Sequence, residues 1–359
     1  MMSKLLEKQT WDLLRQVKFP GMNRDIVSFG FVDEVSATEN GAYVDLAIAT
    51  HKPETAEQIR AEAEAMLREH LSVREVVVRL RVAAPLTPGQ AAVARDASLI
   101  PEVEDVVAVA SGKGGVGKST VAVNLAVKLG QLSHRVGLLD ADIYGPSIPM
   151  MFGIDERPRI EGKRMLPFEK HGIKLMSLGF IVDVDQPVIW RGPMVGKALE
   201  QMLGDVEWGP LDYMIVDFPP GTGDAQLTMG QKVAMSGAVV VTTPQDVALI
   251  DARKGLAMFE KMNVPVVGII ENMSTFVCPH CGEGTDIFKE GGGRRTAELL
   301  GCPFLGTIPL DPAIMESGDS GIPIVVSEPE GPHGEAFRQV AEAVVAEVSK
   351  YETPKVSIF

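Results

Sequence analysis

The stretch SGKGGVGKST at residues 111–120 constrains the fold more than any other part of the chain. It follows the apolar run VVAVA and leads into VAVNLAVKL, so a strand, a glycine-rich loop and a helix are expected in succession. This is the context required of the phosphate-binding pattern G-x-x-x-x-G-K-[ST]. Glycines let backbone amides face phosphate oxygens, and the helix start adds a partial positive charge. The stretch therefore predicts a nucleotide-binding α/β domain, and a chance glycine-rich turn is the weaker interpretation.

Individual residues of this loop have distinct expected roles. Lys118 should reach the β- and γ-phosphates of ATP, and the hydroxyl of Ser119 should ligate Mg²⁺. Lys113 is not required by the ordinary pattern, so it is either a solvated surface charge or a second cation directed at phosphate. The residues expected to bind nucleotide here are Gly112, Lys113, Gly114, Gly115, Val116, Gly117, Lys118, Ser119 and Thr120.

The rest of the chain predicts two domains. From Val106 onward, short apolar strands alternate with helical segments, which indicates a mostly parallel sheet with helices on both faces. Residues 1–83 predict a small α+β domain, in the order helix, two strands joined at Asn40-Gly41, helix and strand. Residues 84–104 contain prolines and lack periodicity, which indicates a linker. The ATPase domain is then expected over residues 105–359.

Aspartates end two of the expected parallel strands. LLDAD places Asp140 and Asp142 after one strand, and YMIVDF places Asp217 at the end of another. Open α/β sheets bind ligands at the carboxyl ends of their strands. We expect Asp217 to hold Mg²⁺ through water and Asp140 to help position the ion, although a strand-end aspartate is more often a cap or turn residue. The turn Gly221-Thr222-Gly223 is expected to move when the γ-phosphate leaves.

The stretch FVCPHCGEG contains two of the three cysteines, Cys278 and Cys281. Three cysteines in 359 residues exclude a disulfide framework and favour a reducing compartment. A Cys-x-x-Cys pair is half of the four-ligand set that zinc or an iron–sulfur cluster usually needs. His280 is expected to point outward. Cys302 is expected to be a buried core cysteine.

Charge and hydropathy limit the partners. The formal net charge of −14 argues against nucleic acid as the main partner. No apolar run approaches the ~20 residues that span a bilayer, and the N-terminus lacks the apolar region of a signal peptide. The acidic face expected for the C-terminal helix does not suit a membrane surface. We therefore expect a cytoplasmic protein.

The sequence GKGGVGKS resembles the deviant Walker A signature of a family that includes the nitrogenase iron protein, the cell-division positioning ATPases and the plasmid-partition ATPases. The resemblance implies that Lys113 reaches across a dimer interface to the partner's nucleotide. It implies that Asp142 orients the attacking water. It also implies that Asn272 contacts adenine, with an ordinary turn asparagine as the competing interpretation.

Four motifs in order, SGKGGVGKST, DADIYGPSIP, PPGTGD and ENMSTFVCPHCG, closely resemble the Mrp/ApbC family of iron–sulfur cluster carrier ATPases over residues 105–345. Residues 1–83 resemble the small iron–sulfur assembly domain fused upstream in bacterial members. The loop THKPETA lacks the reactive cysteine of free-standing versions, so interaction or docking fits this domain better than direct cluster binding.

The resemblance implies a homodimer, and a two-fold axis turns one Cys-x-x-Cys per chain into four thiolates. Cys278 and Cys281 of both subunits would then hold a [4Fe–4S] cluster. The expected activity is slow ATP hydrolysis, because no acidic catalytic base is evident beyond the Asp142 water contact. The cluster would pass from a donating scaffold to recipient apoproteins.

Three alternatives remain at this stage. An ATP-gated reductase resembling nitrogenase iron protein is disfavoured, because its ligand cysteines lie on two well-separated segments. A positioning or partition ATPase of the MinD/ParA kind has no need of Cys278 and Cys281. A structural zinc at the Cys-x-x-Cys is the last alternative.

Overall fold

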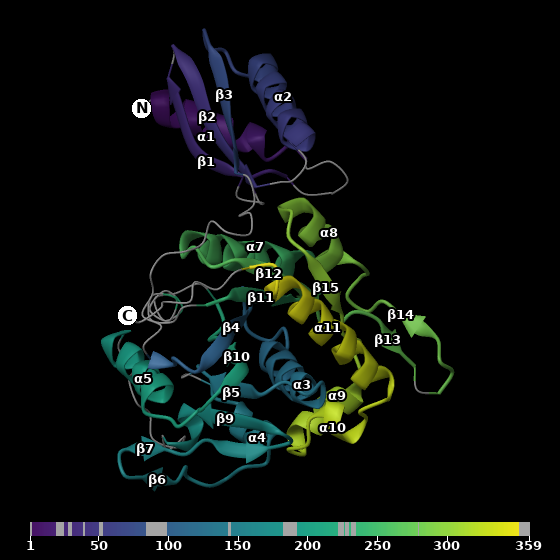
Figure 1. The fold of residues 1–359 in the computed structure, drawn as a ribbon. Coiled ribbons are helices and arrows are strands. Elements are labelled where there is room, and N and C mark those ends of the chain that lie inside the picture. Colours follow the sequence, from purple (N-terminus) through teal and green to yellow (C-terminus); the bar gives the residue numbers. More distant parts are fainter. Residues whose placement is uncertain are drawn as a thin grey trace. The chain divides into compact units, whose positions relative to one another are not determined.

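The computed structural model describes residues 2–18, 25–27, 31–38, 40–49, 53–83, 99–142, 145–181, 192–221, 226, 230, 235–278 and 280–351. The chain divides into two compact units, one formed chiefly by residues 1–87 and the other chiefly by residues 88–359 (Figure 1).

The first unit is a three-stranded sheet with two helices. Its elements are α1 (Met2–Leu14), β1 (Val32–Thr38), β2 (Gly41–Ala49), α2 (Pro53–His70) and β3 (Val76–Ala83). Strand β2 lies in the middle, antiparallel to β1 and parallel to β3. Thr38 pairs with Gly41 across the tight turn between β1 and β2. The predicted order of helices and strands is confirmed.

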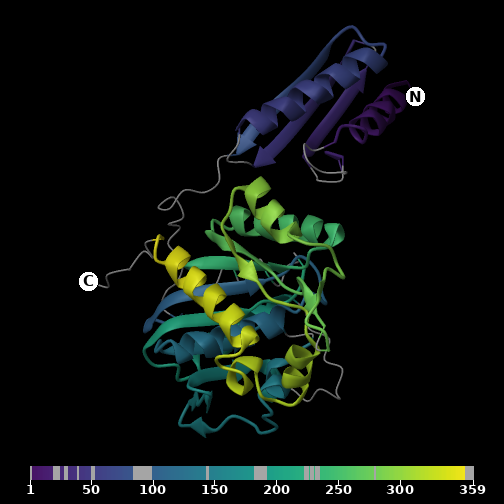
Figure 2. The same ribbon diagram turned by 90° about the vertical axis from the view of Figure 1, so that its right-hand side faces the viewer.

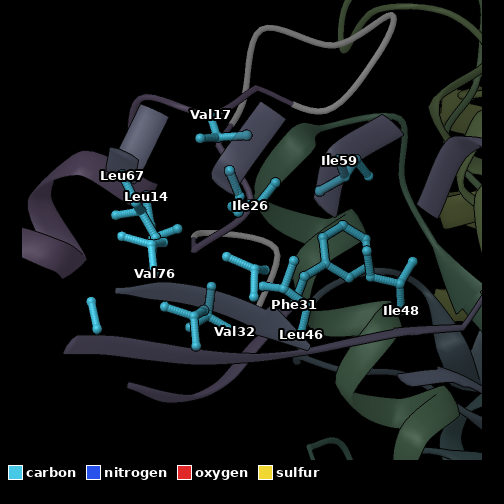
Figure 3. Packing of buried hydrophobic residues seen from close by; sticks show 14 of the residues in the cluster. Leu14, Val17, Ile26, Phe31, Val32, Leu46, Ile48, Ile59, Leu67 and Val76 are labelled. Atoms are coloured by element: carbon cyan, nitrogen blue, oxygen red, sulfur yellow. The ribbon is translucent and has the colours of Figure 1, made fainter. Parts of the chain in front are cut away.

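A separate hydrophobic core holds the first unit together. Val44, Leu46 and Ile48 alternate along β2 and are each at most 1% exposed, so one face of the sheet is buried. Figure 3 shows this face meeting side chains from both helices. The labelled side chains are Leu14, Val17, Ile26, Phe31, Val32, Leu46, Ile48, Ile59, Leu67 and Val76. Burying one such aliphatic side chain contributes about 1.5–3 kcal/mol.

The second unit is built on an eight-stranded sheet in the order β15-β12-β11-β4-β10-β5-β9-β8. These strands are β4 (Val103–Ala110), β5 (Val136–Asp140), β8 (Phe168–Lys170), β9 (Ile173–Ser177), β10 (Leu211–Asp217), β11 (Gly237–Thr242), β12 (Val266–Glu271) and β15 (Phe304–Thr307). All neighbours are parallel except the edge strand β8, which is antiparallel to β9. The predicted mostly parallel sheet is confirmed. Strand β4 begins inside the stretch assigned to the linker.

Helices cover both faces of this sheet (Figures 1 and 2). The longer ones are α3 (Lys118–Gln131), α5 (Gly192–Gly204), α7 (Asp246–Lys261), α8 (Gly292–Leu300), α9 (Pro312–Asp319) and α11 (Pro332–Val348). Helices α3 and α11 pack against each other on one face, while α7 covers β11 and β12. The apolar stripe of α11, which includes Phe337, Val340 and Val344, is buried. None of the helices in the described residues is long and apolar enough to cross a bilayer.

Short elements complete the second unit. They are α4 (Ile148–Met151), β6 (Ile160–Glu161), β7 (Arg164–Met165), the 3-10 turn η2 (Leu178–Phe180), β13 (Phe276–Val277), β14 (Gly284–Thr285) and α10 (Ile324–Ser327). Strands β13 and β14 form an antiparallel hairpin in the connection between β12 and α8. This hairpin contains the two closely spaced cysteines.

Candidate functional site

The glycine-rich loop joins the carboxyl end of β4 to the start of α3. Gly115 and Gly117 have φ of 79° and 78°, a left-handed conformation that favours glycine. A Cβ atom on Gly117 would also lie 2.2 Å from Nδ2 of Asn272. A Cβ atom on Gly112 would lie 1.9 Å from the backbone carbonyl of Asp251 in α7. The glycines therefore serve both the curvature of the loop and its close packing.

Lys118 lies at the centre of a buried charge cluster. Its ammonium group donates to Oδ1 of Asp217 at 2.6 Å and lies 3.8 Å from Oδ2 of Asp142. Lys118 is 6% exposed, Asp142 9% and Asp217 fully buried, so these charges interact with little screening by water. The structure thus brings together three residues that the sequence places far apart. Lys113, in the same loop, is half-buried.

Asp140 organises the segment that carries Asp142. Its Oδ1 accepts from the backbone N–H of Asp142 at 3.1 Å, and its Oδ2 accepts from the hydroxyl of Ser177 at 2.9 Å. The backbone N–H of Ile148 lies 3.4 Å from the same Oδ2. Burial, together with the neighbouring charge of Asp217, raises the pKa of Asp140 to about 7.

The second carboxylate oxygen of Asp217 suits a metal ion. Burial raises the pKa of Asp217, while Lys118 and Ser119 act against that shift. Its Oδ2 is buried and has no hydrogen-bond partner among the described residues. A buried, unpartnered carboxylate oxygen carries a large desolvation cost unless a cation or water meets it. Ser119 and Asp217 together supply the hard oxygen ligands that Mg²⁺ prefers.

Asn272 contacts the glycine-rich loop directly. It follows β12, is 6% exposed, and its Nδ2 donates to the backbone carbonyl of Val116 at 2.8 Å. Its own backbone N–H donates to the carbonyl of Thr242 at the end of β11. This contact with the loop was not anticipated, and the expected contact with adenine stays a prediction.

Two further residues support the site without having been predicted. Ser177, at the end of β9, holds Asp140 as described above. Gln226 is 3% exposed, and its Nε2 donates to the carbonyls of Pro219 and Pro220 at 3.1 and 2.9 Å. Thr222 and Gly223 of the expected mobile turn lie outside the described residues. The Ser177 contact depends on two strands meeting in space. The Gln226 contact is local and could have been suspected from its place just after PPGTGD.

The cysteine hairpin presents two thiols at the surface. Cys278 is half-buried and Cys281 exposed. The N–H of Cys278 donates to the carbonyl of Glu283 at 3.0 Å, and the N–H of Gly282 donates back to the carbonyl of Cys278 at 2.8 Å. Backbone N–H groups of Cys281 and His280 lower the pKa of the Cys278 thiol, which favours the thiolate that binds metals.

The remaining potential ligands differ from this pair. His280 is exposed. Cys302 follows α8 and is half-buried, and desolvation raises its pKa to about 12, so it stays a thiol at neutral pH. Within the part of the chain that the structure describes, no three His, Cys, Asp or Glu side chains gather as a metal site.

The connection that carries the hairpin is tied at its base. Glu271, the last residue of β12, is buried, and its carboxylate accepts from the N–H of Gly293 in the first turn of α8. The start and the end of the connection are therefore bonded to each other, and the hairpin extends beyond that bond.

Two protein families match the chain in separate regions. The family described as the NUBPL iron-transfer P-loop NTPases matches residues 102–345. The family described as iron–sulfur cluster assembly proteins matches residues 7–79. A protein of Synechocystis sp. named iron–sulfur cluster carrier protein is 44% identical over 343 residues, which cover 94% of this chain and 96% of that protein.

Solved structures resemble the second unit. A nucleotide-binding protein from Archaeoglobus fulgidus in complex with ADP has a TM-score of 0.57 and 39% identity, over 66% of this chain and 93% of that one. The cell-division ATPase MinD of Pyrococcus furiosus has a TM-score of 0.52 at 22% identity, over 68% of this chain and 99% of that one. The second similarity concerns the fold alone.

Proposed function

Since the chain belongs to the NUBPL family of iron-transfer P-loop NTPases, we propose that it carries an iron–sulfur cluster and that ATP controls how tightly the cluster is held. The observation that carries this proposal is the Cys278–Cys281 hairpin on a nucleotide-binding fold. The hairpin presents two thiols at the surface, and one of them has a lowered pKa. The Synechocystis relative that matches nearly the whole chain is named a cluster carrier, which supports the same function.

The cluster in this proposal is shared between two subunits. Each chain offers two closely spaced thiols, whereas [4Fe–4S] clusters are usually held by four. A two-fold axis near the hairpin would bring Cys278 and Cys281 of both copies together. The cluster is cargo here, received from a donor scaffold and passed to apoproteins in a reducing cytoplasm.

ATP would act on the charge cluster around Lys118. Lys118 is paired with Asp217. Phosphate oxygens offer Lys118 a competing anionic partner, so nucleotide binding would release Asp217. Ser119 and Asp217 would then hold Mg²⁺, which supplies charge neutralisation at the phosphates. The backbone amides of the glycine-rich loop would bind phosphate, and Asn272 would contact the adenine.

Hydrolysis in this proposal is slow. Asp142 lies at the edge of the cluster, where it would orient the attacking water. Its backbone is held by Asp140, which Ser177 in turn holds. Lys113 would complete the site of the partner subunit in the dimer, as an arginine finger does in other NTPases. Departure of the γ-phosphate would reverse these contacts and shift the dimer between two states.

The small first unit would recognise partners. It has a core of its own, and the family that matches it is described as cluster assembly proteins. The stretch THKPETA that follows β2 in the sequence has no cysteine, so cluster ligation is not assigned to this unit. The first unit would instead bind the donor scaffold or the recipient apoproteins.

Anaerobic reconstitution tests the carrier function. The parent and the variants Cys278→Ala, Cys281→Ala and Cys302→Ala are loaded with iron and sulfide under one condition, and iron, sulfide and molecular mass are measured. We expect one cluster per parent dimer, loss of most iron in the first two variants, and a full cluster in Cys302→Ala. A full cluster in Cys281→Ala, or one cluster per parent monomer, contradicts the shared site. Bound zinc without any cluster supports a structural site instead.

ATP turnover tests the nucleotide site. Lys118→Ala removes the cation that meets the phosphates, so we expect hydrolysis to fall to background. Lys113→Ala should keep most ATP binding and lose hydrolysis, because its proposed role lies in the partner's site. Steady-state phosphate release and ATP titration measure the two effects. Wild-type turnover in Lys118→Ala would refute the assignment of the loop, and wild-type turnover in Lys113→Ala would refute the role in trans.

A further inference from the structure

The phosphate loop and the cysteine hairpin are joined by a short, bonded segment of chain. Cys278 follows Asn272 by six positions. At one end of the segment, the side chain of Asn272 donates to the carbonyl of Val116 in the phosphate loop. At the other end, Phe276 and Val277 form β13, the strand that leads into Cys278.

The bond to Val116 acts on a peptide unit of the glycine-rich loop that would bind the phosphates of ATP. The carbonyl of Val116 and the N–H of Gly117 belong to one planar peptide group, so turning one turns the other. Asn272 holds the carbonyl side of that group at 2.8 Å. Gly117 belongs to the loop whose amides would bind phosphate. A rotation of this peptide by phosphate therefore changes the force on the Asn272 side chain.

The segment after Asn272 is stiff enough to pass on such a change. Met273 has φ of 54°, a left-handed conformation that is costly for a residue with a side chain. Ser274 donates to the carbonyl of Ile308 through both its N–H and its hydroxyl, each at 3.0 Å. The N–H of Leu310 then donates to the carbonyl of Thr275, and Phe276 forms a parallel bridge with Leu310. A continuous series of hydrogen bonds thus runs alongside the segment as far as β13.

We propose that Asn272 is the positioning residue through which the state of the phosphate loop reaches Cys278 and Cys281. The inference deepens the proposed function and depends on the hairpin being its metal site. Asn272 need not touch the metal or the reacting phosphate. Its amide links a peptide of the glycine-rich loop to β13, the strand that leads into Cys278. ATP binding would therefore change the position and exposure of the Cys278 and Cys281 thiols.

Thiol alkylation in the metal-free protein tests this coupling without relying on iron. The full chain is treated with iodoacetamide with and without saturating ATP–Mg²⁺, and labelling of each cysteine is followed by peptide mass spectrometry. In the parent we expect ATP to change the labelling rate of Cys278 or Cys281 by about fivefold or more, the lower range of measured allosteric couplings. ATP binding to Asn272→Ala is titrated first, and labelling is compared at an ATP concentration that this titration shows to be saturating; the labelling rate of the variant should then no longer respond to ATP.

A matched variant separates coupling from a general loss of stability. Asn124 is also a buried asparagine, 2% exposed, and it donates to a backbone carbonyl at 2.9 Å, but within α3 and away from the hairpin. Asn124→Ala should keep the ATP response of the thiols. If Asn272→Ala does not fold or bind ATP, Asn272→Leu is used, because it keeps the approximate size of the side chain and removes the N–H donor without adding a charge.

The outcomes separate this inference from the proposed function. An ATP response that persists in the Asn272 variant, that is absent in the parent, or that is lost equally in Asn124→Ala overturns the role of Asn272. Reconstitution of the same proteins with iron and sulfide is scored separately. Asn272→Ala should still accept a cluster, so a parent that takes none refutes the carrier function whatever the alkylation shows.

Discussion

The surroundings of the Asp140 carboxyl group disfavour its ionised form. Three donors hold it, yet full burial and the nearby Asp217 raise its pKa to about 7. Folding therefore favours the protonated form, and the free energy of unfolding falls as pH rises from about 4 to about 7. Above pH 7 the folded protein without nucleotide carries the full cost of the ionised group.

Asp140→Asn should consequently stabilise the nucleotide-free protein at high pH. At pH 5.5 the folded parent still keeps the Asp140 proton, although its unfolded form has already lost it, so we expect only part of the gain in the free energy of unfolding at that pH. At pH 8 we expect the variant to gain about 1–4 kcal/mol over the parent, because a shift of one pKa unit corresponds to about 1.4 kcal/mol. Urea denaturation at the two pH values measures this. A difference between the two proteins that does not widen with pH would show that the charge of Asp140 costs nothing.

Cys278 and Cys302 should differ in reactivity in the order of their thiolate content. The pKa of Cys278 is lowered by backbone N–H groups, whereas burial raises that of Cys302 to about 12. Only the thiolate is alkylated, so at pH 8 about one Cys302 in ten thousand is reactive at any moment. We expect iodoacetamide to modify Cys278 well over tenfold faster than Cys302 in the metal-free protein. Comparable rates would mean that the region around Cys302 opens readily.

For single residues, the sequence predicted which charged side chains share a site better than it predicted the hydrogen bonds that support them. Lys118, Asp142 and Asp217 were expected at one site because strand-end positions of a parallel sheet share an edge, and the structure places them within one charge cluster. Ser177 and Gln226 were missed. The role of Ser177 arises from a hydrogen bond to Asp140 at the end of another strand, and a lone serine has no spacing that signals such a bond. Gln226 bonds to the prolines of the neighbouring PPGTGD stretch, so its position was the only available signal.

Among the structural elements, the phosphate loop has the strictest conformational requirements. Gly117→Ala would place a methyl group 2.2 Å from the Asn272 amide at a φ of 78°, whereas a Cβ atom on Gly114 would meet nothing within 4 Å. We expect the first substitution to cost about 1–3 kcal/mol in the free energy of unfolding, from left-handed strain and displaced packing. Gly114→Ala is the matched control and should stay within about 0.5 kcal/mol. Equal losses from the two substitutions would contradict the packing described here.

Most of the elements that the sequence missed are short. The core strands were evident because they are continuous apolar runs between helices. Strands β6, β7 and β8 span two or three residues each, too few for any periodicity. Strand β9 is longer, but its lysine interrupts the apolar run in IKLMS. Its burial follows from pairing with β5, which is a contact between segments.

For the whole molecule, the separate cores predict separate folding. The first unit has its own cluster of buried side chains, so residues 1–87 expressed alone should unfold cooperatively, with a modest stability of about 3–5 kcal/mol. Residues 88–359 alone should bind ATP with an affinity within about twofold of the full chain, because the site residues lie in that unit. Circular dichroism melts and ATP titrations measure both. A non-cooperative melt of the short fragment would show that it depends on the rest of the chain.

The bond between Glu271 and Gly293 has a consequence for how such proteins can diversify. The bond joins the two ends of the connection that contains the cysteines. The end of β12 and the start of α8 therefore stay bonded to each other whatever residues lie between them. Extra length in a loop with tethered ends adds little entropic cost, about 0.6 kcal/mol for each doubling. An ATPase of this fold could therefore gain or lose a metal-binding hairpin in evolution through one insertion or deletion. For the same reason, residues 276–285 are a suitable segment to replace with sequences that carry other sets of metal ligands.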